Sequence, residues 1–117
     1  MAYTPRQGDI IHLEFDPASG REMKGDHYAL VISPSAFNRL GLALACPISQ
    51  GAADLARSYG LVVTLMGAGT HTQGAIHCQH LKSLDWRARN ARFKESVPAD
   101  ILDEVLARIE PLLSREG

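Results

Sequence analysis

Residues 8–22 read GDIIHLEFDPASGRE, and this stretch decides how the fold begins. Between residues 9 and 15 apolar and polar positions alternate, with Ile11, Leu13 and Phe15 on one side of the chain. A period of two is typical of a β-strand that buries one face. The Asp-Pro-Ala-Ser-Gly run that follows has no such period and is rich in turn residues. It therefore predicts a strand followed by a long loop.

Further apolar segments extend this pattern through the chain. They are residues 28–33, 42–48, 61–65 and 75–79. Each segment is short and rich in β-branched or other apolar residues, which favours strands, so we expect the first loop to run as far as His27. Five or more short strands predict a sheet that curls into a small barrel. A short helix is predicted within residues 33–41, and residues 50–58 are expected to form a connecting loop.

The C-terminal region has a different period. From Ile101 to Leu113 apolar residues recur every three or four positions, and Pro98 lies near the expected first turn. These features predict one long amphipathic helix, with a kinked or frayed last turn because of Pro111. The predicted fold class is therefore α+β: a curled antiparallel β-sheet with a short helix and a long C-terminal helix.

The composition limits the classes of function. The 117 residues fit one domain, 1–117, and 12 Lys and Arg against 13 Asp and Glu give a net charge near -1. Any nucleic-acid site must therefore be local. The chain has no run of about 18 apolar residues and a polar N-terminus, so neither a membrane span nor a secretory signal is expected, and the cytoplasm is the expected compartment. Cys46 and Cys78 lie in apolar segments and are expected to be small buried hydrophobes, with a disulfide left open.

Four segments together carry a family resemblance. They are GDIIHLEFDPASGRE (8–22), ALVISPSAFN (29–38), CPISQG (46–51) and QHLKSLDWRAR (79–89). In order and spacing they resemble the MazF/PemK/ChpB family of toxin endoribonucleases, and most closely its ChpB branch. The resemblance implies an SH3-like curled sheet and a homodimer. It also implies cleavage of single-stranded RNA without metal or another cofactor, and an antitoxin partner whose tail occupies the RNA groove.

The resemblance also implies catalytic positions. In the family an Arg at the end of the first loop and a Thr at a strand end are the usual pair, and these positions fall on His27 and Ser49 here. Glu22 occupies the place of a loop carboxylate. Serine keeps the hydroxyl, whereas histidine replaces a planar, always-charged cation with a group that titrates near neutrality. A solvated loop histidine and a turn hydroxyl remain the ordinary explanations for the two residues.

Other residues are expected to contact RNA. They are Phe15, Asp16, Arg21, Lys24, Gln50, His77 and Gln79. The alignment of the first loop with the family pattern is open, so Arg21 or Lys24 could supply the cation of the family arginine. His77 and Gln79, two apart on a predicted strand, would share a face and could contact a base edge. The basic residues that follow Trp86 could position phosphates or protect a sheet edge.

A metal site is not expected. His71, His77 and His80 form the only histidine cluster, but His77 and His80 would point to opposite faces of a strand, and no carboxylate or thiolate spacing completes a ligand set.

Two functions of different classes fit these observations. The first is a metal-independent endoribonuclease toxin in which His27 and Ser49 support cleavage. The second is a catalytically impaired dimer of the same fold that binds an antitoxin or another protein target. A purely structural interaction module is a third and weaker hypothesis.

Overall fold

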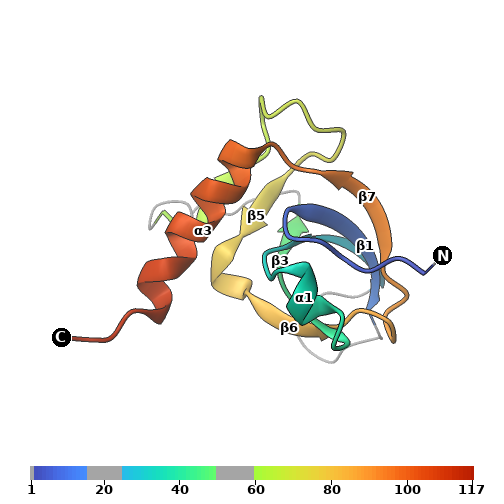
Figure 1. The fold of residues 1–117 in the computed structure, drawn as a ribbon. Coiled ribbons are helices and arrows are strands. Elements are labelled where there is room, and N and C mark those ends of the chain that lie inside the picture. Colours follow the sequence, from blue (N-terminus) through green and yellow to red (C-terminus); the bar gives the residue numbers. More distant parts are fainter. Residues whose placement is uncertain (1, 16–24, 50–59) are drawn as a thin grey trace.

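The computed structural model describes residues 2–15, 25–49 and 60–117, and Figure 1 shows their arrangement. Within these residues seven strands form one sheet, in the order β4-β5-β3-β2-β1-β7, and β6 pairs with β3. The strands are β1 (Asp9–Phe15), β2 (Gly25–Val31), β3 (Leu42–Ser49), β4 (Val62–Thr64), β5 (Ala75–His77), β6 (Lys82–Asp85) and β7 (Arg92–Ser96). The helices are α1 (Ser35–Asn38), the 3-10 turn η1 (Cys78–His80) and α3 (Ala99–Leu113). The predicted α+β fold, with its curled antiparallel sheet, is confirmed.

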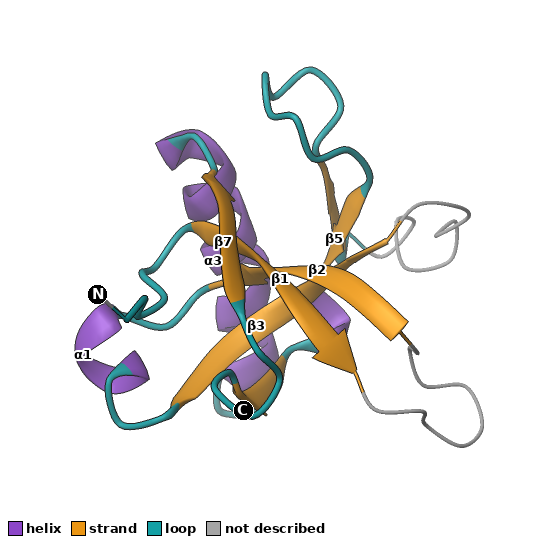
Figure 2. Cartoon of the chain, turned by 90° about the vertical axis from the view of Figure 1, so that its right-hand side faces the viewer, coloured by secondary structure: helices purple, strands orange, loops and turns teal. Residues whose placement is uncertain are grey.

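The sheet buries apolar side chains on both faces. On one face Ile10, Leu30 and Ile76 pack in a cluster with Val105 and Ile109 of α3. The helix crosses this side of the sheet in Figure 1, and its buried positions recur at the spacing expected of an amphipathic helix. The other face of the curled sheet, whose strands cross at an angle in Figure 2, has a core of its own. That second cluster contains Ile11, Leu13, Ala29, Val31, Ala43, Ala45, Leu84 and Trp86.

A polar centre holds α1 against the sheet. Asn38 is fully buried, and its Nδ2 donates hydrogen bonds to the carbonyl oxygens of Pro5 (2.8 Å) and Ser33 (3.0 Å). The Ser33 hydroxyl donates to Oδ1 of Asn38 and accepts a bond from the backbone N–H of Leu44. The Trp86 indole N–H donates to the carbonyl oxygen of Asn38 at 2.8 Å. Ser33 and Asn38 of the SPSAFN segment are therefore structural residues, because buried polar groups need hydrogen-bond partners.

Two boundary predictions were wrong. β2 begins at Gly25, so His27 lies within a strand and not in a loop. The strand predicted over residues 75–79 ends at His77, and the chain then turns through η1. The strands β6 and β7 were not predicted because they are short and largely exposed, with polar side chains at most positions.

The remaining expectations concern the end of α3 and the cysteines. α3 extends two residues beyond Pro111. Cys46 and Cys78 are both buried and both free thiols, as expected of small hydrophobes. Within the described part of the chain, no helix has the length and apolar character needed to cross a membrane.

Candidate active site

Three of the singled-out residues lie in a row across neighbouring strands. When the β2–β3 register is continued by one position, His27 lies opposite Ser49, the last residue of β3. On the other side of β3, Ala75 of β5 pairs with Ser49, and His77 follows two residues later. Side chains of directly opposed residues share a face of the sheet, as do residues two apart along a strand. The register therefore places His27, Ser49 and His77 on the same face.

Ser49 and His77 are joined directly. The Ser49 Oγ and the His77 Nε2 are 2.6 Å apart, and the Gln79 Nε2 lies 3.1 Å from the His77 Nδ1. Both nitrogens of the imidazole are therefore engaged, which fixes the plane of the ring. The result is a three-residue chain in the order Gln79, His77, Ser49.

The direction of the hydrogen bonds in this chain depends on the Gln79 amide. When its NH₂ group donates to Nδ1, the imidazole proton lies on Nε2 and is donated to the Ser49 hydroxyl oxygen. The Gln79 Oε1 is then buried without a partner among the described residues. Rotation of the amide lets Nδ1–H donate to Oε1, so that Nε2 accepts the Ser49 hydroxyl proton. The His77 imidazole can therefore carry its proton on either Nε2 or Nδ1, depending on the orientation of the Gln79 amide.

The environment keeps His77 neutral. Its pKa is lowered from the ordinary 6.5, first because the ring is partly buried and second because of the charge of His80. The two rings lie 5.8 Å apart between centroids, although the sequence predicted opposite faces. That prediction was wrong because His80 belongs to η1 and not to a strand. A neutral imidazole bonded to a hydroxyl can accept a proton at neutral pH.

The structure describes only part of the predicted site. His27, Ser49, His77 and Gln79 lie in described elements, and the bond between Ser49 and His77 brings together a predicted catalytic residue and a predicted RNA-binding one. The Phe15 backbone ends β1. The other predicted residues, Asp16, Arg21, Glu22, Lys24 and Gln50, lie outside the described residues. Gln79 was expected on the strand with His77, but it reaches the imidazole from the 3-10 turn.

Sequence reasoning missed the bond between Ser49 and His77. The two residues are 28 positions apart, and their contact depends on the β3–β5 register. A cue was present, because Ser49 ends one apolar segment and His77 lies in another. Pairing of these two segments could not be deduced from either one alone.

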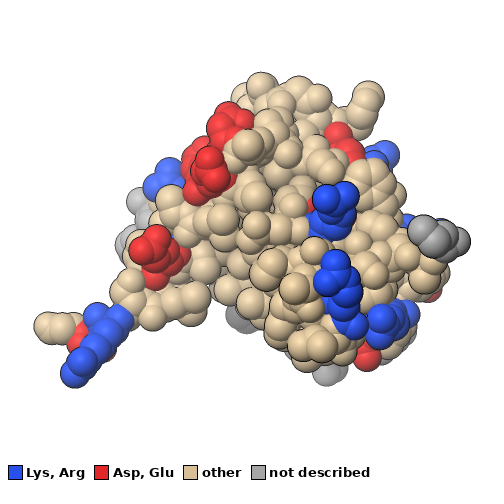
Figure 3. Space-filling model, viewed as in Figure 1, with Lys and Arg blue, Asp and Glu red and all other residues tan. Residues whose placement is uncertain are grey.

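The charged residues of the surface are separated by region. In Figure 3 acidic side chains gather over α3, whereas Lys and Arg are prominent on the opposite side of the same view. The helix carries Asp100, Asp103, Glu104 and Glu110. Among the residues that the structure describes, no group of three His, Cys, Asp or Glu side chains is placed to hold a metal ion.

Comparison with known proteins gives consistent matches along the chain. Residues 6–113 match the family described as the PemK-like, MazF-like toxin of type II toxin-antitoxin systems. The endoribonuclease PemK of Escherichia coli is 35% identical over 109 residues, which span 92% of this chain and 81% of PemK. The endoribonuclease toxin ChpB of Escherichia coli K12 is 35% identical over 108 residues, 92% of each chain.

A solved structure agrees with these sequence matches. The MazE–MazF structure (Form-II) from Deinococcus radiodurans superposes with a TM-score of 0.82 and 39% sequence identity. The superposition covers 96% of this chain and 97% of that one. The family resemblance given by the four sequence segments is thereby confirmed.

Proposed function

The chain belongs to the family of PemK-like, MazF-like toxins of type II toxin-antitoxin systems, and we propose that it is itself an endoribonuclease that cuts single-stranded RNA. The observation that carries the proposal is the chain of Gln79, His77 and Ser49, with His27 opposite Ser49 in the neighbouring strand. This arrangement supplies a neutral imidazole, a hydroxyl and a second imidazole on one face of the sheet.

The proposed reaction is an intramolecular transfer. The 2′-hydroxyl of one ribose attacks the adjacent phosphorus, the bond to the 5′-oxygen of the next nucleotide breaks, and a 2′,3′-cyclic phosphate forms. His77, which its lowered pKa keeps neutral, accepts the 2′-hydroxyl proton at Nε2 once the Ser49 hydroxyl has turned from that nitrogen toward the phosphate. Ser49 donates to a non-bridging phosphate oxygen, where negative charge develops. His27 protonates the leaving 5′-oxygen, and Gln79 holds the His77 ring in position.

The test is cleavage of a long RNA in the presence of EDTA. Fragments that end in 2′,3′-cyclic phosphate are expected, because no step in this reaction uses a metal ion. Ser49→Ala is expected to slow cleavage about 100-fold or more, the usual effect of removing one oxyanion donor. Ser114→Ala is the matched control, since it removes a hydroxyl near the end of α3 that donates to the Glu110 carbonyl oxygen. Intact RNA at high protein concentration would refute the proposal.

The second candidate is a dimer of this fold that binds a protein target without cutting RNA. It is favoured by one observation, the histidine at position 27, where the family has an arginine. An imidazole lacks the fixed charge and the forked donors with which guanidinium holds a phosphate. The two candidates differ in the EDTA assay, because only the first one predicts cleaved RNA.

The proposed partners are a second copy of the chain and an antitoxin. A MazE–MazF structure is among the similar structures, which supports an antitoxin of comparable type. Apolar side chains that remain exposed, among them Met66 and Leu113 at 81% and 74%, offer surface that a second copy would cover. Light scattering behind a sizing column would show a mass near twice 12.7 kDa for the dimer.

A further inference from the structure

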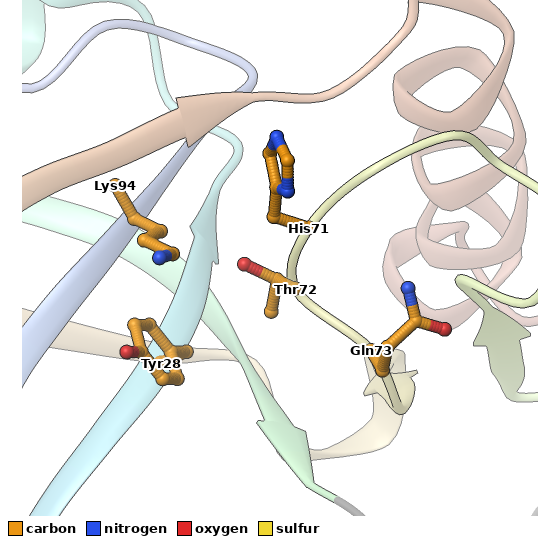
Figure 4. Close-up of a pocket in the computed structure, with 5 residues that line it drawn as sticks. All are labelled: Tyr28, His71, Thr72, Gln73 and Lys94. Carbon is orange, nitrogen blue, oxygen red and sulfur yellow. The ribbon is translucent and has the colours of Figure 1, made fainter.

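A small pocket lies away from the row of His27, Ser49 and His77. It is lined by Tyr28 of β2, Lys94 of β7 and residues 71–73 of the loop between β4 and β5, and its volume is about 200 Å³. Figure 4 shows Lys94 extending toward Tyr28, with the Thr72 hydroxyl directed toward them from the loop and the His71 ring turned away. Because neighbouring residues of a strand point to opposite faces, Tyr28 and His27 face different sides of the sheet. The pocket is therefore a separate site.

The loop wall of the pocket is held in place by Glu95. Its Oε1 accepts the backbone N–H of His71 at 3.0 Å. Its Oε2 accepts the backbone N–H and the hydroxyl of Thr72 at 2.6 and 2.7 Å. These bonds engage both oxygens of the Glu95 carboxylate with the loop that lines the pocket. The Lys94 ammonium, by contrast, has no hydrogen-bond or ion-pair partner among the described residues.

A basic and aromatic strip leads up to the pocket from β1 and β7. The ring of His12 contacts the ring of Tyr28 edge to face, with centroids 5.4 Å apart. The Arg92 Nη2 donates to the His12 Nδ1 at 3.0 Å. The strip therefore has two aromatic rings, those of His12 and Tyr28, between two permanent cations. Arg92 is the cation beside His12, and Lys94 is the cation beside Tyr28.

From this juxtaposition we propose that the pocket and strip bind single-stranded RNA outside the cleaved bond, with a base against Tyr28 and a phosphate at Lys94. Single-stranded nucleic acids are held by aromatic rings on which bases stack and by basic groups that follow the backbone. The pocket is smaller than the roughly 300–1,000 Å³ of sites for drug-sized ligands, so it suits one nucleotide of a longer strand. The inference rests on the proposed function, because it supplies a second contact for the same substrate.

The positive charge of the strip favours RNA over a basic protein as the ligand of the pocket. The acidic side chains gather over α3 in Figure 3, whereas the strip carries Arg92 and Lys94. An acidic peptide remains the other ligand that such a strip would attract, and the experiment therefore includes one.

The test measures binding of a fluorescein-labelled uridine 20-mer with 2′-O-methyl riboses, which cannot be cut because the attacking hydroxyl is blocked. Fluorescence anisotropy gives the Kd of the full chain across a series of salt concentrations. Lys94→Gln is expected to weaken binding three- to tenfold. It should also reduce the slope of log K against log salt by about 0.7, the contribution of one phosphate contact on a single strand. Arg115→Gln is the control, because it removes the same charge beyond the end of α3.

A second variant tests the aromatic contact. Tyr28→Leu is expected to weaken binding about tenfold without changing the salt slope, since stacking of one base contributes on the order of 1–3 kcal/mol. Circular dichroism melting checks that Tyr28→Leu still folds, and Lys94→Gln provides an independent result if it does not. Equal Kd and equal slope for the parent and Lys94→Gln would overturn the subsite, even if the parent cuts RNA. A poly-glutamate peptide whose binding alone is weakened by Lys94→Gln would also overturn it, in favour of a protein partner.

Discussion

Glu95 gives the clearest prediction about stability, because one half-buried carboxylate accepts three hydrogen bonds from the loop that follows β4. Glu95→Gln keeps the shape of the side chain but leaves a single acceptor oxygen. If that oxygen faces Thr72, the bonds from the Thr72 N–H and hydroxyl become neutral, and the bond from the His71 N–H is lost. Bonds to a charged group contribute about 1.5–3 kcal/mol each and neutral ones about 0.5–1.5 kcal/mol.

These values can be combined into a prediction for the free energy of unfolding. One lost bond and two weakened ones would cost about 3.5–6 kcal/mol in a fully buried site, and partial exposure reduces this to about 1.5–3 kcal/mol. In a chain of this size the melting temperature should fall by about 6–12 °C. Glu104→Gln is the control: its carboxylate forms one exposed pair with Arg108 at 3.5 Å, for which less than about 0.5 kcal/mol is expected.

The pH dependence supplies a second readout for the same change. Burial raises the pKa of Glu95, but the hydrogen bonds from Thr72 and His71 outweigh burial and lower it below the ordinary 4.5. A carboxyl whose pKa is lower in the folded chain stabilises the fold fully above its unfolded pKa, and this stabilisation is lost as the pH falls through the folded value. The gap between parent and Glu95→Gln should therefore be widest above pH 4.5 and should shrink below it.

Thermal melts at pH 7 and at several lower pH values measure both effects. Amide hydrogen exchange at His71 and Thr72 shows whether the loop opens locally, since local opening can leave the global melting temperature unchanged. A variant with parental melting and parental protection of both amides would refute the role given to Glu95.

Two further predictions concern the row of polar residues across β2, β3 and β5. Because His77 acts in its neutral form, the acid limb of kcat/KM should have its midpoint below pH 6.5, and His77→Asn should remove that limb and lower cleavage by about 100- to 10,000-fold. A midpoint at or above 6.5 would contradict the environment described for this ring. His27→Arg restores the residue of the family pattern and is expected to raise cleavage at pH 7. Initial rates on the same RNA, with His27→Gln as the control that adds no charge, measure the gain; equal rates for Arg and Gln would show that the cation is not what the site lacks.

The fold was largely predictable from local patterns, because the alternation from Ile11 to Phe15 in β1 and the three-to-four-residue spacing in α3 are visible in the sequence, although Ile10 is also buried, on the opposite face of β1. β7 was missed since its position at the end of the strand order leaves most of its side chains exposed. A strand that packs few apolar groups carries no alternation to detect.

The candidate site was predictable only in its parts. Ser49 was found from its place at the end of an apolar segment, and His77 was assigned to RNA contact alone. Their bond arises from strand pairing across 28 residues, which local pattern does not determine. The lowered pKa of His77 also depends on the turn that brings His80 beside it. The chemistry of the site therefore depends on how the strands pair, whereas the family membership can be recognised from the sequence alone.

The histidine at position 27 has a consequence for its neighbour across the sheet. His27 and His77 lie on strands separated by β3 and are offset by two residues along it, so their side chains begin about 12 Å apart at the usual strand spacing and rise. A permanent cation at that distance would repel a charged His77 by about 0.3–1.4 kcal/mol for effective dielectric constants of 80 to 20. That repulsion would lower the His77 pKa further.

The two effects of His27→Arg can therefore be separated by pH. Beyond any gain in rate, the acid limb of kcat/KM should move to lower pH, since a like charge disfavours protonation of His77. Raised ionic strength should reverse part of the displacement, because both groups lie partly exposed to solvent. A limb that stays in place while the rate rises would mean that position 27 acts on the RNA alone. A limb that moves without a gain in rate would mean that the imidazole of His27 already performs the task of the family arginine.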